Sequence, residues 1–391
     1  MSNLYTASNQ WATRPADERF WTLTDMRAQC HRYACESRTA TLPFSAIRTE
    51  ARDGDLLLAG KERQANLTHY SFGQLCGLAG APASFLRQLP ATLAAQNLNH
   101  CLKERGSDVA KRDARILFHA NGSLVARSIN SELYDRVWNY ELCDRLLQLQ
   151  NSGWMVPPAR PTNDDPRARP ATEADIIPGQ EDFGLSVKVG DMIAPAGVYA
   201  SDHDMFAFLV NADRVVRAGD RALMRGIIVR NSEVGDGALK FDFFCMDNVC
   251  GNHIIWGVEN VHAISIRHVG QDSLMKGVRA FRAELSKYTD ASAREQEMKI
   301  ERAMEIELGS NKEEILDAVF TYAKSHSLTA ITRKRISAAI DTAEAREDRY
   351  GNPRTVWALV SGLTENSQAD GWTDERSEVD TQAGRLMEIA F

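Results

Sequence analysis

Apolar and polar positions alternate along the middle of the chain and predict a β-sheet there. From Phe183 to Val189 every second residue is apolar, which is the period of a half-buried strand. Further apolar runs follow, separated by short polar turns such as Asn231–Gly237, which contains two glycines. Because these connections are too short for crossover helices, we predict an antiparallel β core over residues 183–270.

Helical spacing of the apolar residues flanks this core on both sides. From Gln271 onward the spacing predicts a helical region over 271–391. Residues 1–150 predict a smaller α+β region, in which two short helices joined by Gly80-Ala-Pro82 form a helix-turn-helix-like unit at about 68–103. We therefore predict an α+β fold with a central, curved antiparallel β-sheet, helices packed on it, a small N-terminal helical unit and a C-terminal helical region.

A proline-rich segment separates the N-terminal region from the β core. Residues 151–182 contain six prolines and many polar residues. Proline lacks the backbone N–H that helices and sheet ladders need, so we predict an extended insertion or linker.

Composition and the absence of motifs narrow the classes of function. A formal net charge of −7 gives no overall attraction to nucleic acid or to anionic membranes, so any basic surface must be local. Seven scattered cysteines without a CxxC pair indicate reduced thiols, and no apolar run of about 18 residues predicts a membrane helix. The chain lacks a basic leader followed by an apolar run, and we expect a cytoplasmic protein. It also lacks a Walker loop, GxGxxG, GxSxG and HExxH, so we expect no cofactor.

The densest basic cluster in the sequence suggests a nucleic-acid interface. Within seventeen positions lie five arginines: Arg214, Arg217, Arg221, Arg225 and Arg230. On a hairpin they would share an edge or a face, and guanidinium groups suit phosphate contacts. Lys240 adds a charge, and nearby aromatic residues would stack on bases of a single strand; they are Phe206, Phe208, Phe243, Phe244 and Trp256. The alternative is a solvated sheet face whose arginines pair with Glu233, Asp236 and Asp242.

Two other basic stretches, Arg333-Lys334-Arg335 and the looser run from Lys103 to Arg115, fit surface solvation better than recognition. The helix-turn-helix-like unit could direct Ser84, Arg87 and Gln88 at DNA, although a small helical packing unit explains the same pattern.

Polar residues in the predicted turns allow a second hypothesis, a metal site. The turns hold more polar side chains than a plain hairpin needs: Asn231, Ser232, Glu233, Asn252 and His253. Carboxylates and imidazole are ordinary metal ligands, and four of them could meet: Asp202, Asp204, Glu233 and His253. Asp202 and Asp204 would share one face of a strand, although Ser201-Asp202 is also a good turn or capping pair.

Short motifs run in order through most of the chain. They are Leu75-Cys76, Gly80-Ala-Pro82, Leu89-Pro90, Asn97-Leu-Asn99, Ser201-Asp-His-Asp-Met-Phe-Ala-Phe-Leu-Val210, Asn231-Ser-Glu-Val-Gly235, Val249-Cys-Gly-Asn-His253, Gly351-Asn-Pro-Arg-Thr-Val-Trp357 and Leu363-Thr-Glu365. In these motifs the chain resembles phage and plasmid proteins that share domain of unknown function 932. The resemblance implies a mobile-element setting and an accessory role in DNA replication, recombination or host takeover, but no activity.

These observations leave hypotheses from different classes. The first is a non-enzymatic nucleic-acid-binding protein of a phage or plasmid that binds or anneals single-stranded DNA, as a homo-oligomer. The alternative is a metal-dependent nuclease or phosphohydrolase. A third is a protein without catalysis that binds a host-defence factor.

Overall fold

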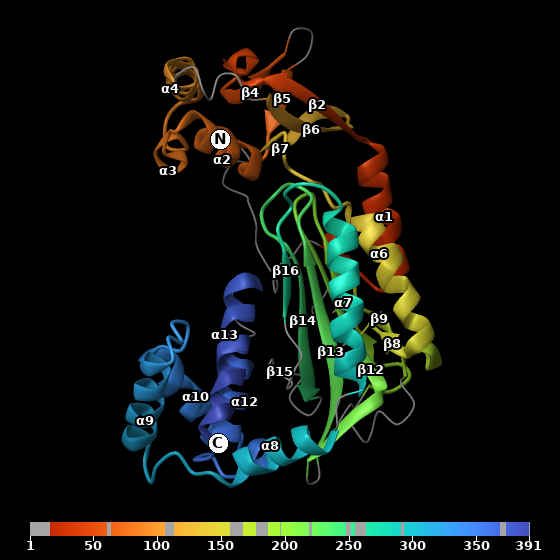
Figure 1. Ribbon diagram of the computed structural model, residues 1–391, viewed down its shortest axis with the longest axis vertical. Coiled ribbons are helices and arrows are strands. Elements are labelled where there is room, and N and C mark those ends of the chain that lie inside the picture. The colour runs from red at the N-terminus through yellow and green to blue at the C-terminus, as the bar shows by residue number, and fades with distance from the viewer. Residues whose placement is uncertain are drawn as a thin grey trace.

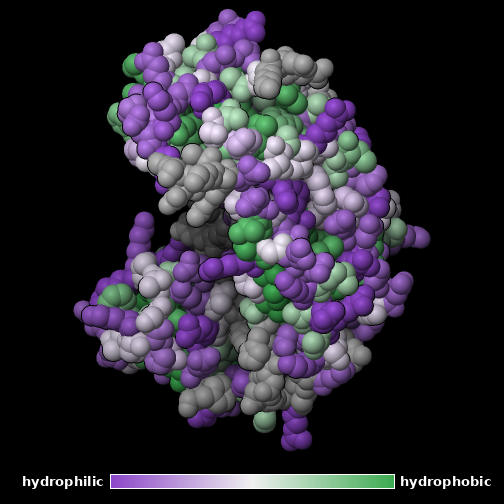
Figure 2. All heavy atoms as spheres, turned by 45° about the horizontal axis from the view of Figure 1, so that its top comes forward, coloured by the Kyte–Doolittle hydropathy of each residue, from purple (hydrophilic) through white to green (hydrophobic). Residues whose placement is uncertain are grey.

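The computed structural model describes residues 16–60, 64–105, 113–156, 167–176, 187–195, 197–218, 221–247, 252–254, 263–290, 293–367 and 373–390. An N-terminal sheet with its own helices lies at one end, a long central sheet occupies the middle, and the C-terminal helices lie beside the other end of that sheet (Figure 1). The surface is hollowed between the N-terminal part and the C-terminal helices (Figure 2).

The N-terminal sheet has the strand order β2-β6-β7-β5-β4-β3. Its strands are β2 (Ser37–Pro43), β3 (Arg48–Arg52), β4 (Asp55–Ala59), β5 (Gln64–Leu67), β6 (Asp113–Asn121) and β7 (Ser123–Ser131). All pairs are antiparallel except β5 with β7, which is parallel. Two hairpins contribute to this sheet, β3–β4 with its turn at Asp53-Gly54 and β6–β7 with its turn at Gly122.

Three helices pack on this sheet and form the predicted helical unit: α2 (His69–Ala79), α3 (Ala83–Leu86) and α4 (Ala91–Glu104). α2 ends at Gly80, whose φ of 70° is the left-handed conformation that glycine adopts without strain. α3 is a single turn, and Arg87 donates to the His69 carbonyl at 3.0 Å and lies over the Phe72 ring. Arg87 therefore packs within the unit, as the packing interpretation expects.

The central sheet is antiparallel, as predicted, with the order β1-β11-β12-β13-β14-β15; β8 also pairs with β12, and β16 with β14. Its strands are β1 (Arg19–Phe20), β8 (Trp154–Met155), β11 (Val198–Ala200), β12 (Met205–Ala218), β13 (Arg221–Asn231), β14 (Leu239–Asp247), β15 (Asn252–Ile254) and β16 (Ile264–Ile266).

Two predictions about the edges of this sheet need correction. Residues 183–186 lie outside the described part, and residues 187–189 are not a strand; Val187 is buried in a small separate cluster. Within the predicted linker, β8 belongs to the central sheet, and β9 (Arg169–Pro170) pairs with β10 (Met192–Ile193). Apolar Trp154 and Met155 precede the prolines, so the chain can still form sheet there.

Three amphipathic helices cover one face of the central sheet: α1 (Leu23–Cys35), α6 (Asn139–Leu147) and α7 (Ser273–Asp290) (Figure 1). Their apolar stripes meet the strands in one core, in which Met26, Leu142 and Phe281 pack with Leu209 and Phe241. The short 3-10 helices are η1 (Ala16–Glu18), η2 (Phe44–Ala46), η3 (Gln148–Ser152), η4 (Glu173–Asp175) and η6 (Leu386–Ala390).

The C-terminal region is helical, as predicted. Its helices are α8 (Ala293–Glu305), α9 (Lys312–Ser325), α10 (Arg333–Ala345), α11 (Glu347–Tyr350), α12 (Val356–Ser367) and α13 (Thr373–Arg385). α12 is buried almost all round, and at Gly362 it passes so close to α10 that an added Cβ would lie 2.4 Å from the Ala339 carbonyl oxygen. The helical core continues onto the sheet through Val216, Leu223 and Cys245. In the part of the chain that the structure describes, no helix has both the length and the apolar character needed to cross a bilayer.

Candidate nucleic-acid interface and buried polar junction

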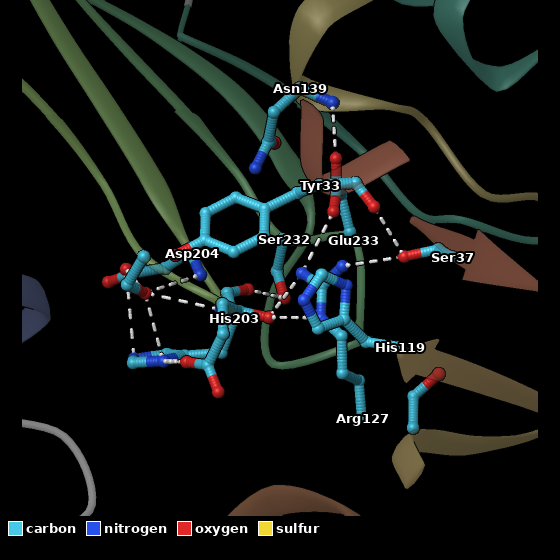
Figure 3. A network of polar contacts seen from close by, with 12 residues as sticks. Tyr33, Ser37, His119, Arg127, Asn139, His203, Asp204, Ser232 and Glu233 are labelled. Atoms are coloured by element: carbon cyan, nitrogen blue, oxygen red, sulfur yellow. Dashed lines mark hydrogen bonds and ion pairs between the residues drawn. The ribbon is translucent and has the colours of Figure 1, made fainter. Parts of the chain in front are cut away.

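Residues 231–234 of the Asn231–Gly235 motif are buried where the N-terminal sheet meets the central sheet (Figure 3). Arg127 Nη2 lies 3.0 Å from Glu233 Oε2, and the two side chains are 2% and 1% exposed. Arg127 Nε also donates to the Asp202 carbonyl at 2.9 Å. Glu233 Oε1 accepts from the Asn139 N–H, the first residue of α6, at 2.9 Å, where a carboxylate also favours the helix dipole. The Glu233 carboxylate is thus satisfied on both oxygens.

The neighbouring residues of this turn also form hydrogen bonds with other parts of the chain. Asn231 Nδ2 donates to the Val137 carbonyl at 2.9 Å, and Ser232 Oγ donates to the His203 carbonyl at 2.7 Å. The Val234 carbonyl accepts from Gln74 Nε2 at 2.6 Å. Gly235 has a φ of 92° and leaves only 2.9 Å between an added Cβ and Asn130 Nδ2. These contacts assign the motif a structural role in joining the two sheets.

Burial perturbs several ionisable groups at this junction. The Arg136 guanidinium, which donates to the Glu233 carbonyl, has its pKa lowered to about 10 because burial disfavours its charged form. Burial raises the pKa of Tyr134, whose hydroxyl donates to the Ser232 carbonyl at 2.9 Å. The pKa of His119 is lowered, first by burial and then by the charge of Arg127.

The residues of the predicted metal site are held by protein contacts instead. His203 Nδ1 lies 2.9 Å from Asp202 Oδ1, and Ser201 Oγ donates to Asp204 Oδ1 at 2.6 Å while accepting from the His203 and Asp204 N–H groups. This is the turn that the alternative interpretation expects, and it precedes β12, so Asp202 and Asp204 do not lie on a strand.

Glu233, the third predicted ligand, pairs with Arg127. The side chains of Asn252 and His253 lie outside the described part, although both residues belong to β15. Among the side chains that the structure describes, no three His, Cys, Asp or Glu are grouped as a metal site requires.

The arginine cluster does not form the shared exposed face that we predicted. Arg225 is buried, donates to the Thr289 carbonyl at 3.1 Å and lies over the Tyr288 ring. Arg230 is buried and pairs with Asp242 at 2.6 Å, one of the acidic partners that the alternative named. Arg217 is exposed and Lys240 is half-buried. The side chains of Arg214 and Arg221, on β12 and β13, are outside what the structure describes.

The aromatic residues of the predicted single-strand interface lie in the protein core. Phe206, Phe208, Phe243 and Phe244 are all buried, and they face both sides of the sheet. Trp256 lies outside the described residues. The four described rings cannot stack on nucleic-acid bases, because the protein already covers them.

The structure reveals a basic surface that the sequence interpretation missed. Lys276, Arg279 and Arg282 are exposed on the outer side of α7, spaced three residues apart. Arg145 on α6 and Arg267 shortly before α7 are exposed as well. Within the described chain, none of these five cations forms an ion pair with an acidic side chain. The three-residue spacing of Lys276, Arg279 and Arg282 is visible in the sequence. A search for consecutive basic residues misses it because other residues lie between these cations.

A groove between α6 and α7 separates the two parts of this surface. Leu142, Leu146 and Leu149 line one side, Val278 and Phe281 line the other, and Phe241 of the sheet also contributes. Arg145 and Arg282 stand on opposite sides, and Arg282 Nη2 donates across to Gln148 Oε1 at 3.1 Å. We call Arg145, Arg267, Lys276, Arg279 and Arg282 the α6–α7 basic face.

Comparison with known proteins places more than half of the chain in a family. Residues 182–389 match the family described as domain of unknown function (DUF932). The matched range contains the motifs from Ser201 onward, while those between Leu75 and Asn99 precede it. No curated protein and no solved structure matches the chain.

Proposed function

Because the chain belongs to the DUF932 family, whose description names no activity, we propose a function from its surface: the protein binds nucleic acid through the α6–α7 basic face. The observation that carries this proposal is that five exposed cations stand without acidic partners in the described chain.

The composition of the chain offers enough acidic residues to pair with the cations of this face. The chain has 53 acidic residues against 46 basic ones, so acidic partners are not scarce. Some cations elsewhere take them, since Lys312 pairs with Asp341 and Arg333 with Asp317. On α7 the acidic Glu284 pairs with Lys287, and Asp290 accepts from Ser286. An uncompensated row of cations is the electrostatic footprint expected for binding a phosphate backbone.

The proposed setting follows from the phage and plasmid resemblance. We place the protein in the cytoplasm as a non-enzymatic accessory of replication or recombination, acting on DNA that these processes expose as single strands. Self-association into a homo-oligomer would extend the basic face along the strand.

The experiment compares a face variant with a charge-matched control. Lys276→Gln/Arg279→Gln/Arg282→Gln removes three cations from exposed helix positions, where glutamine preserves helix propensity. Lys324→Gln/Lys334→Gln/Arg349→Gln removes three exposed cations from the C-terminal helices. Binding of a fluorescent 30-nucleotide strand is measured by anisotropy between 50 and 200 mM NaCl.

For four to five phosphate contacts we expect a salt slope of about −3, and so a roughly 60-fold loss of affinity across that range. The face variant should lower the steepness of that slope by about two, and the control variant should bind like the unmodified protein. Binding that ignores salt, or equal losses in the two variants, contradicts the proposal.

A further inference from the structure

We infer that the α6–α7 basic face holds the phosphodiester backbone without reading bases, so that its ligand class includes duplex as well as single-stranded nucleic acid. This inference rests on the proposed function and specifies which part of the nucleic acid the face contacts.

The face offers no surface on which a base can stack. Among described side chains, the one exposed Phe, Tyr or Trp is Phe85, on α3 of the N-terminal part. Phe281 in the groove is 4% exposed and stacks on Phe241 at 4.4 Å between ring centroids. Tyr140 of α6 packs edge-on against His31 and beneath Arg27. Single-strand binding that depends on bases draws on such rings, so that contribution is missing here.

The face also lacks an unengaged amide side chain that could read adenine. An amide side chain reads adenine with both its oxygen and its nitrogen. Gln148, the amide beside the groove, already accepts from Arg282 through its oxygen. The remaining exposed positions on the outer side of α7 include Ala283 and Ser286, and Ser286 Oγ donates to Asp290.

The two helices together form a surface too wide to enter a groove of a duplex. α6 and α7 lie side by side on the sheet and share one groove (Figure 1). Two adjacent helices of about 10 Å diameter present a surface roughly 20 Å wide. The major groove of a duplex is about 12 Å wide and admits one helix, so this pair cannot enter it. Lys276 and Arg282 stand about 9 Å apart along the helix axis, and a cation row of that kind follows phosphates on the outside of either ligand.

The test uses three ligands of equal length: a mixed-sequence single strand, the corresponding duplex, and a strand whose bases are all replaced by tetrahydrofuran abasic sites. We expect the abasic strand to bind within about threefold of the single strand, because stacking would be worth a factor of about 5 to 150 for each stacked base. The duplex should bind at least as tightly, since its phosphates are denser. The Lys276→Gln/Arg279→Gln/Arg282→Gln variant should lower the affinity for all three ligands to the same degree.

The outcomes separate this inference from the proposed function. A tenfold or greater loss for the abasic strand, or a duplex that fails to bind while the single strand binds, overturns the backbone-only inference and leaves the proposed function standing. If none of the three ligands binds, or if the variant binds all of them like the unmodified protein, both are overturned.

Discussion

Arg127 and Glu233 form a buried ion pair, at 3.0 Å, that joins strand β7 of the N-terminal sheet to the turn after β13 of the central sheet, across 106 residues of sequence. Arg127 occupies a β-bulge, since Leu117 is opposite Ser128 while the next residue, Phe118, is opposite Ala126. The bulge inserts one extra residue and so directs its side chain out of the N-terminal sheet toward the central one. A local irregularity in one sheet thus fixes the position of the other.

Truncating either partner of this pair should destabilise the protein severely. Arg127→Ala or Glu233→Ala leaves the other charge buried and unpaired, and we expect each to lower the free energy of unfolding by about 3–5 kcal/mol. Urea denaturation followed by circular dichroism measures the change. The control is Arg333→Ala, which breaks an exposed pair with Asp317 and should cost less than about 1 kcal/mol. Comparable losses at the two sites would show that the buried pair is not what joins the sheets.

A methyl group at Gly226 should be poorly tolerated. An added Cβ would lie 2.2 Å from Phe244 Cζ, so the ring must shift within the packed sheet. We expect Gly226→Ala to cost about 1–3 kcal/mol in unfolding free energy, and Phe244→Leu in the same chain to restore part of it. Gly237→Ala is the matched control, because nothing lies within 4 Å of its added Cβ, and it should change stability by less than about 0.5 kcal/mol. A tolerated alanine at Gly226 would contradict the close approach of Phe244.

Stability should fall as the pH drops below about 6.5, the ordinary pKa of histidine. Burial lowers the pKa of both His119 and His268, so the folded protein favours their neutral forms. Between the folded and unfolded pKa values the unfolded chain binds more protons, and acid therefore favours unfolding in that window. Unfolding free energies measured from pH 7.5 to 5.0 should fall less steeply in His268→Gln.

The exposed His100 supplies the control for this pH dependence. His100→Gln should leave the steepness unchanged. A pH profile that His268→Gln does not alter would contradict a neutral, buried imidazole at that position.

Sequence periodicity identified the elements because it reports local geometry. The helical region predicted over 271–391 contains α7, Ser273–Asp290, and α9, Lys312–Ser325. The parallel pairing of β5 with β7 has no comparable local signal, since α2, α3, α4 and β6 lie between these strands in the chain.

The burial of the arginines could not be predicted from the sequence either. Arg225 donates to carbonyls more than sixty residues away, at the end of α7, so no local pattern distinguishes it from an exposed neighbour such as Arg217. The row formed by Lys276 and Arg279 is the opposite case, because it repeats with the helix period and needs no distant contact to be recognised.

The family match begins at residue 182, downstream of Arg127 and of the helices α1 and α6. A polypeptide reduced to the matched range would keep α7 but lose α1 and α6 from one face of the central sheet, and Glu233 would lose its partner Arg127. A protein that has the Asn-Ser-Glu-Val-Gly turn but no equivalent N-terminal half would need an added domain or a second subunit to cover the sheet and to supply the cation.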